Sequence, residues 1–482
     1  MRVFEALFLV LFLFSMISLL FKKQNPCLYA GGFAILTGVI SFLTEGCRIH
    51  SIPAFILAIA LLLAELAKKA ARKKKISKVL RQLGLIFFVP LAVLSIALPL
   101  LFPVVQLPAP KGPYPVGTTY MSFMDLSREE RLSETNNHRN VPVQVWYPAS
   151  NTEGKQVARW ISSREAIRLF SEYRGLPDLF GHFTLVKTHS SLNADVCEAE
   201  KQYPVILFSG GGAMFSGQNV IQMEELASRG YIVYAVGHPY EDFACIYPDE
   251  TLVPYSEKQK RELSTDTAKA VEAAKQTVAD TESGEFHKAI LRNAPVNNVS
   301  VKNWSKDMQF IADKVFEMND GSEESIFFGK LDVSNLGAFG HSFGGAASGQ
   351  LCLEDDRIKA FVNMDGSPFG DAPDKEIDQP FMVLTHGGEE KYSIQTGYSE
   401  KEKNYYVVQI SGAKHMDFSD LNSLIPAVGR LSGFLGSIPK ERQIEIMNHY
   451  ILDFFNRHLK GMPSTLLDAA SSIYPEVTVH RY

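Results

Sequence analysis

Residues 340 to 344 read Gly-His-Ser-Phe-Gly and directly follow an apolar run that ends at Phe339. Small residues come next, so the central serine is predicted to lie at a sharp turn from a strand into a helix. Such a turn exposes a hydroxyl, and it needs glycines because side chains at the flanking positions would collide with neighbouring backbone. The pattern predicts Ser342 as a catalytic nucleophile; the alternative is a glycine-rich turn whose serine only caps the helix.

Two residues further along the chain have the chemistry that an activated serine needs. Asp365 follows the predicted strand 358–364, and His415 follows the predicted strand 405–410. An imidazole can take the proton of a serine hydroxyl, and a carboxylate can orient that imidazole and stabilise its positive charge. The order Ser, Asp, His is the one expected of an α/β-hydrolase. We therefore predict Asp365 as the acid, although it could instead be a turn-forming aspartate, and His415 as the general base.

Other residues compete for these roles. His386 also follows a predicted strand, and the acid could come from the same loop, where Glu389 is the runner-up and Glu390 is its neighbour. His341 adjoins the serine, but the turn should direct it away, so we expect it to pack beneath the turn. His238 ends another predicted strand and could line the pocket without serving as the base.

An acyl-transfer site also needs two backbone amides to stabilise an oxyanion. One should come from Phe343, the residue after the serine, and the other from the glycine-rich loop that follows the predicted strand 205–209. Gly212 is the preferred donor in that loop, with Gly211 and Ala213 close behind. A phosphate-binding loop is the alternative, but the sequence lacks the Lys-Ser/Thr that follows the glycines of a nucleotide site.

From residue 110 onward, strand-like runs alternate with helical ones. This alternation predicts an α/β fold, a doubly wound and mostly parallel sheet, in which loops at the carboxyl ends of strands carry the chemistry. The expected strands are 142–147, 205–209, 231–236, 333–339, 358–364, 381–385 and 405–410. The expected helices are 217–229, 301–317, 343–353 and 440–459.

The first 107 residues differ from the rest because long apolar runs dominate them. Four stretches stand out, 3–21, 27–43, 52–66 and 85–105; the outer two reach bilayer length and the middle two are marginal. Lysines and arginines crowd between the third and fourth stretches, which predicts that this loop is cytoplasmic. We therefore expect a four-helix, multi-pass region of the cell membrane, and an extracytoplasmic catalytic domain over 108–482.

Charge and cysteine content exclude little but point away from some functions. The net charge is −5, and no basic stripe suggests a nucleic-acid partner. The five cysteines lack metal-site spacing, so we expect no metal site. We also expect no cofactor, because acyl transfer through a serine needs none. A disulfide between Cys197 and Cys245 is conceivable if the domain is extracytoplasmic.

Two segments bear on how a substrate would enter. Residues 240–300 interrupt the minimal fold, and we expect a helical cap over the pocket, although a solvated insertion fits equally well. Residues 421–438 are apolar with glycines and prolines, which favours either core packing or an element that touches lipid.

With these residues assembled, residues 110 to 462 resemble the platelet-activating factor acetylhydrolase family of the plasma, lipoprotein-associated type. An ordered series carries the resemblance: Val145-Trp146-Tyr147-Pro148, Tyr203 to Ser209 before the glycine loop, Gly340 to Gly345, Asp365, and Gly412, His415, Phe418 and Asp420. The resemblance implies Ser342, Asp365 and His415 as the triad and Gly212 and Phe343 as oxyanion donors. The chain departs from the family where Gly210-Gly211 replace His-Gly and where a membrane region is added.

Together these features favour a membrane-anchored serine ester hydrolase. The resemblance implies metal-independent cleavage of short or modified acyl chains from phospholipid-like substrates, or of a small ester. The alternatives are a peptidase of the same fold and a non-catalytic membrane sensor or scaffold with a decayed hydrolase domain. Acyl length, head group, physiological role and oligomeric state stay open.

Overall fold

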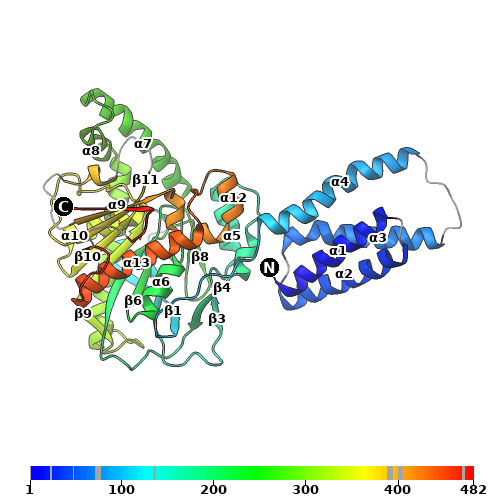
Figure 1. Ribbon diagram of the computed structural model, residues 1–482. Helices are drawn as coiled ribbons and strands as arrows, with labels where there is room; N and C mark the ends of the chain where they lie inside the picture. Colours follow the sequence, from blue (N-terminus) through cyan, green and yellow to red (C-terminus); the bar gives the residue numbers. More distant parts are fainter. Residues whose placement is uncertain are drawn as a thin grey trace. The chain divides into compact units, whose positions relative to one another are not determined.

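The computed structural model of the chain describes residues 2–21, 24–46, 48–70, 78–133, 137–387, 394–399, 405–468 and 473–482. Contacts divide it into two compact units. The first comprises Met1–Gln106 with Gly175–Val186, and the second comprises Leu107–Arg174 with Lys187–Tyr482 (Figure 1). Because Glu389 lies in 388–393, the runner-up acid is outside the described residues.

Each of the four apolar stretches forms a helix in the first unit. The helices are α1 (Val3–Leu20), α2 (Gln24–Thr44), α3 (Ile52–Ala70), which follows the short η1 (Ile49–Ser51), and α4 (Lys78–Leu101). Two described segments, Asn25–Thr44 and Ile49–Ala67, are long and apolar enough to cross a membrane, whereas Val3–Ser18 and Phe88–Leu101 are shorter. The middle stretches gain this length because helix continues past both apolar runs. Four spans therefore stay a prediction.

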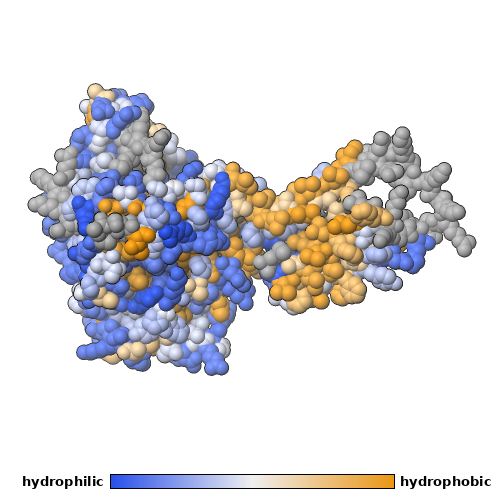
Figure 2. Space-filling view, viewed as in Figure 1, coloured by the Kyte–Doolittle hydropathy of each residue, from blue (hydrophilic) through white to orange (hydrophobic). Residues whose placement is uncertain are grey.

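The face of these helices that Figure 2 shows is largely apolar. Large hydrophobic side chains that are more than half exposed occur on every one of them: Val10, Phe14, Leu36, Ile56 and Val93. Soluble proteins seldom expose a continuous apolar surface of this kind, and such a surface marks contact with a membrane or another protein.

Polar groups tie the helix ends together at one end of this unit. The Glu45 carboxylate after α2 accepts hydrogen bonds from the amides of Phe4 and Glu5 in the first turn of α1, at 3.0 and 3.1 Å. Arg48 forms a buried ion pair with Glu5 and donates to the carbonyl of Phe102, just past α4. The starts of α1 and α3 and the ends of α2 and α4 therefore lie together, which is an up-and-down arrangement of helices.

The second unit is built on a sheet of eleven strands in the order β13-β12-β11-β10-β9-β5-β6-β2-β1-β4-β3. The strands from β12 to β6 pair in parallel, while β2 and β13 pair antiparallel at either side of this parallel centre. All seven expected strands are present: β2 (His138–Pro148), β5 (Tyr203–Ser209), β6 (Ile232–Val236), β9 (Leu331–His341), β10 (Ile358–Met364), β11 (Phe381–Gly387) and β12 (Tyr405–Ser411). The remaining four strands of this sheet are not predicted from the sequence: β1 (Val116–Glu129), β3 (Val157–Arg159), β4 (Lys187–Leu192) and β13 (Val477–Arg481).

Helices cover both faces of this sheet (Figure 1). The four expected helices are α6 (Val220–Ser228), α9 (Pro295–Asp320), α10 (Phe343–Glu354) and α13 (Lys440–Lys460). Because neighbouring strand residues point to opposite faces, β9 shows the division. Gly337 lies against Phe455 and Leu459 of α13, whereas Ala338 belongs to the buried core that α9 and α10 share with the sheet.

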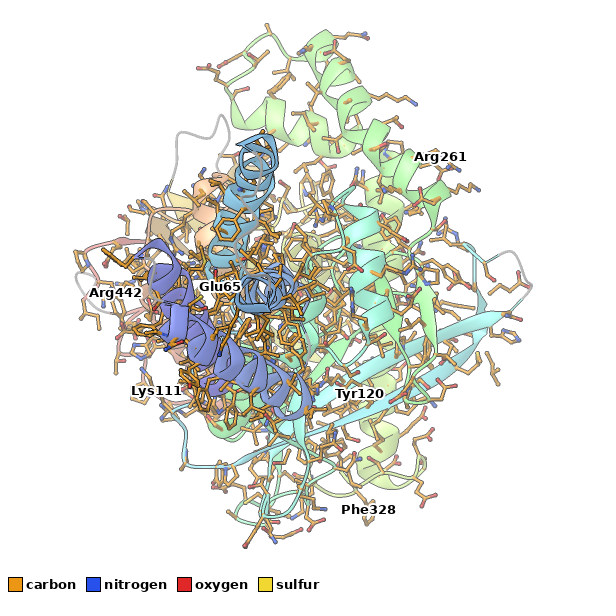
Figure 3. The ribbon with its side chains drawn as sticks, turned by 90° about the vertical axis from the view of Figure 1, so that its right-hand side faces the viewer. Glu65, Lys111, Tyr120, Arg261, Phe328 and Arg442 are labelled. Atoms are coloured by element: carbon orange, nitrogen blue, oxygen red, sulfur yellow. The ribbon has the colours of Figure 1, made fainter. Side chains whose placement is uncertain are left out.

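The segment 240–300 contains a hairpin and two helices before it enters α9. The hairpin pairs β7 (Ala244–Ile246) with β8 (Leu252–Pro254), and the helices are α7 (Glu257–Thr277) and α8 (Gly284–Arg292). Serine hydroxyls at Ser256 and Ser283 accept from amides in the first turns and fix where both helices begin. Arg261 of α7 is exposed (Figure 3). Whether this segment acts as a cap stays a prediction.

The structure does not contain the disulfide that the sequence allows between Cys197 and Cys245. Cys197 and Cys245 are both buried free thiols, as are Cys27 and Cys352, while Cys47 lies outside the described residues. The Cys245 sulfur instead lies 3.5 Å from a carboxylate oxygen of Asp242. The disulfide is therefore absent from the described part of the chain.

Candidate active site

Ser342 lies at the turn between β9 and α10, with φ of 54° and ψ of −120°. This left-handed backbone is strained for a residue with a side chain and is held by hydrogen bonds on both sides. The Ser342 amide donates to the carbonyl of Met364 at 2.8 Å, and the Ser342 carbonyl accepts from the Gly345 amide at 3.0 Å. Hydrogen bonds to β10 and to the first turn of α10 therefore keep the Ser342 backbone in this strained conformation.

The glycines around the serine are required by close backbone contacts, as the sequence analysis predicts. A Cβ atom on Gly340 would lie 2.2 Å from the carbonyl carbon of Gly344. A Cβ atom on Gly344 would lie 2.1 Å from the carbonyl oxygen of Ser209, at the end of β5. No side chain fits at either position, so the turn can form only with glycine there.

The structure brings Ser342, His415 and Asp365 into one hydrogen-bonded chain. His415 lies at the start of η4 (His415–Phe418), and its Nε2 is 3.0 Å from the Ser342 hydroxyl oxygen. Its Nδ1 is 2.7 Å from a carboxylate oxygen of Asp365, which directly follows β10. These distances allow proton transfer from the hydroxyl to an imidazole that the carboxylate orients.

The Asp365 carboxylate is ionised although it is buried. Its side chain is 1% exposed, and burial alone would raise its pKa. Hydrogen bonds from His386 and from His415 outweigh burial and hold the pKa of Asp365 well below its usual range. An ionised carboxylate at this place stabilises a protonated His415.

His386 is close to the acid but does not replace the predicted base. Its Nδ1 lies 2.8 and 2.9 Å from the two carboxylate oxygens of Asp365, on the same carboxylate that His415 contacts. His386 is thus a second hydrogen-bond donor to the Asp365 carboxylate.

His341 is buried beside the base. Its Nε2 lies 3.0 Å from the carbonyl oxygen of His415, and its Nδ1 lies 2.6 Å from Nε2 of Gln218. Burial, and next the proximity of His415, lower the pKa of His341 to about 3. A neutral ring that accepts from Gln218 and donates to the carbonyl holds the backbone of His415 in place.

Among the amides of Gly211, Gly212 and Ala213 in the glycine loop, one has no protein acceptor within the described residues. The Gly211 amide donates to the side chain of Gln218 at 2.8 Å, and the Ala213 amide donates to a backbone carbonyl at 3.3 Å. Within the described part of the chain, the amides of Gly212 and Phe343 have no protein acceptor. A Cβ atom on Gly212 would lie 3.6 Å from the Cβ atom of Phe343, so the two residues are adjacent.

His238 belongs to a buried network and lines no described pocket. Its Nδ1 lies 2.9 Å from Asp307, and its Nε2 lies 2.9 Å from the hydroxyl of Ser209. Asp307 also accepts two hydrogen bonds from Arg139, at 2.7 and 2.6 Å, and the indole of Trp304 stacks on the His238 ring at 3.9 Å. Because the side chains of His238 and Asp307 are fully buried, this second Ser-His-Asp chain is structural.

An open cleft of about 1130 Å³ gives access to the base. His415, whose side chain is 43% exposed, lies in its wall. Cationic and apolar side chains share the lining: Arg174, Lys414, Arg430, Phe434 and Leu435. The segment 421–438 turns out to be mainly core, since most of its apolar side chains are buried, but Leu431 is 80% and Phe434 40% exposed.

Comparison with known protein families identifies the family of this chain. Residues 100–464 match the family described as "Platelet-activating factor acetylhydrolase, isoform II". The chain belongs to this family. It is 26% identical over 373 residues to the platelet-activating factor acetylhydrolase of Cavia porcellus, covering 73% of this chain and 78% of that protein.

Two further relatives agree with this placement. A protein of Arthroderma benhamiae named "Probable 1-alkyl-2-acetylglycerophosphocholine esterase" is 26% identical over 298 residues, covering 57% of this chain and 65% of the relative. The solved structure of a ferulic acid esterase from Streptomyces cinnamoneus aligns with a TM-score of 0.59 and 25% identity, covering 78% of this chain and all of that one. The chain is a carboxylic ester hydrolase with an α/β-hydrolase fold.

Two further residues, Gln218 and His386, take part in the site in ways that the sequence does not predict. Gln218 joins the amide of Gly211 to the ring of His341, but nothing in its sequence context marks it. The sequence predicts His386 only as a rival base, whereas the parallel register of β10 and β11 places its ring beside the Asp365 carboxylate.

Proposed function

We propose that the chain is a membrane-anchored serine ester hydrolase in which Ser342 is the nucleophile, His415 the general base and Asp365 the acid. The observation that supports this most directly is the unbroken hydrogen-bonded chain from the Ser342 hydroxyl through His415 to Asp365. Ester hydrolysis by such a chain needs no metal and no cofactor.

The proposed reaction is acyl transfer in two halves. His415 accepts the Ser342 proton as the hydroxyl oxygen attacks the ester carbonyl, and the amides of Gly212 and Phe343 stabilise the oxyanion. His415 then donates this proton to the leaving alkoxide as the carbonyl–oxygen bond breaks, which leaves an acyl-enzyme. Water attacks the acyl-enzyme with His415 again as base. His415 then returns this proton to the Ser342 oxygen as the bond from that oxygen to the acyl carbon breaks, and the carboxylic acid departs.

The proposed substrates are phospholipid-like esters with a short or modified acyl chain. Two relatives support this class by name, one as a platelet-activating factor acetylhydrolase and one as an alkylacetylglycerophosphocholine esterase. The cleft beside His415 also suits an amphiphilic ester, because Lys414 and Arg430 can face an acidic group while Phe434 meets an acyl or alkyl chain.

The competing functions predict different reactivity. A peptidase of this fold would cleave amides as well as esters, whereas the relatives and the structural neighbour are named as ester hydrolases. A decayed membrane sensor would not need the strained serine backbone to be kept, since strain of this kind is retained where it serves a function.

Labelling with a fluorophosphonate probe tests the proposal. The wild-type protein should react at Ser342, and Ser342→Ala should not. A panel of p-nitrophenyl esters from two to twelve carbons, alongside acetylated and long-chain phospholipids, should show a preference for short chains. Absence of labelling in the folded wild-type protein would refute the proposal, and hydrolysis of peptides alone would favour the peptidase.

We propose that the membrane anchor has four spans. The contacts of Arg48 with Glu5 and with the Phe102 carbonyl support this, because they connect the start of α1 to the end of α4 in an up-and-down arrangement. Reporter fusions after Arg81 and after Pro110 should then lie on opposite sides of the membrane, the first cytoplasmic and the second extracytoplasmic. A reporter after Glu45 is the matched control and should agree with the one at Pro110. Finding the Arg81 and Pro110 reporters on the same side would contradict four spans.

A further inference from the structure

Two imidazoles share the carboxylate of Asp365. His415 contacts one carboxylate oxygen through Nδ1 at 2.7 Å, and His386 contacts both oxygens through Nδ1 at 2.8 and 2.9 Å. The Thr385 hydroxyl adds a third side-chain donor at 2.9 Å, and the His386 amide adds a backbone donor at 3.2 Å. A triad requires only one of these donors, the one on His415.

The arrangement follows from the sheet register. In the parallel pair β10–β11, Met364 lies opposite Leu384, and the Asp365 amide donates to the Leu384 carbonyl at 2.8 Å. The next two residues of β11, Thr385 and His386, therefore reach the carboxylate from the adjacent strand. A strand end is more rigid than a loop, so it fixes these donors well.

The Asp365 carboxylate determines which ring nitrogens of His386 and His415 carry a proton. An ionised carboxylate can only accept hydrogen bonds, so Nδ1 of both His386 and His415 must carry a proton. The His386 side chain is 11% exposed and lines the same cleft as His415. Its donor role therefore does not depend on whether the ring is neutral or charged.

We propose that His386 is a positioning residue that fixes the Asp365 carboxylate through Nδ1 and thereby tunes the basicity of His415. This inference rests on the proposed triad. A carboxylate that is already satisfied by His386 stabilises the protonated His415 less strongly than a carboxylate without that donor. His386 thus limits the basicity of His415 while it holds the acid in one orientation.

Other charged groups near His415 do not replace this effect. Within the described residues, the neighbouring titratable and cationic side chains are His341 of β9, Asp417 of η4, and Lys414, Arg430 and Arg174 in the cleft wall. Asp417 accepts from the amides of Lys414 and Gly436, and His341 meets the backbone of His415. Of these groups, none has a hydrogen bond to the Asp365 carboxylate.

The test compares two variants of His386 in the full-length protein. His386→Leu removes the donor, whereas His386→Asn can place an amide N–H near the position of Nδ1 without a titrating ring. With His386→Leu we expect the acid limb of kcat/KM against pH to move upward by about half a unit or more, because the carboxylate then favours the charged imidazole. A looser acid should also lower kcat by about 10-fold.

The expected result is that His386→Asn restores the wild-type acid limb. His480→Leu, an exposed histidine on β13, is the matched control and should leave the profile unchanged. Fluorophosphonate labelling counts the active sites of each variant, so a poorly folded sample is separated from a shifted profile. An unshifted limb in a labelled His386→Leu variant, or the same shift in both variants, would overturn this inference alone, whereas an unlabelled wild type would overturn the proposed function.

Discussion

Replacing Ser342 with alanine is expected to lower kcat by about 10⁴- to 10⁶-fold on an activated ester such as p-nitrophenyl acetate. The Ser342 hydroxyl oxygen is the only protein atom that forms a bond to the acyl carbon in the proposed cycle, so its loss removes the covalent route. What remains is the contribution of binding and of the oxyanion donors, Gly212 and Phe343. Steady-state kinetics on purified protein in detergent measures the effect, and KM should change little.

The same kinetic measurement on single and double variants shows whether Ser342 and His415 act as one unit. His415→Ala should cost nearly as much as Ser342→Ala, and the double variant should be no slower than either single one. If the losses of the two single variants multiplied in the double variant, the residues would act independently and the proposed triad would be wrong. His480→Leu again serves as the control for a histidine outside the site.

Replacing Asp307 with alanine is expected to destabilise the second unit by about 3 kcal/mol. Asp307 accepts from Arg139 and from His238, and all three side chains are buried. It also forms an ion pair with Arg128 at 2.9 Å, so removing the carboxylate takes a partner from three donors. Arg139 keeps one partner in Glu130, so the cost should lie at the lower end of that for a broken buried ion pair.

Tryptophan fluorescence during urea unfolding in detergent checks this value. The protein's three tryptophans, Trp146, Trp160 and Trp304, all lie buried in the second unit, so their signal reports on that unit. Asp249→Ala is the matched control, because Asp249 is exposed and accepts hydrogen bonds from Thr251. Equal urea midpoints for the two variants would show that the buried network contributes little.

Local sequence patterns were sufficient to predict the strands of the central sheet and the site residues that directly follow these strands. Each expected strand is a short apolar run bounded by turn residues, so it can be recognised without its neighbours. The missed strands are different: β1 is long and partly exposed, and β3 and β13 are short edge strands whose pairing comes from distant segments. Their burial depends on partners that a local pattern does not contain.

The sequence by itself determined the sharp turn at Ser342, because only glycine fits against the backbone there. It also determined the chain order of serine, acid and histidine. It also placed Asp365 and His415 at strand ends, where a parallel sheet collects its chemistry at one edge. Only the tertiary structure decided which amide of the glycine loop is unoccupied, that His386 shares the acid with His415, and that His238 is bound by Asp307. These facts depend on strand register and helix packing, which join residues far apart in the chain at distances that no local pattern encodes.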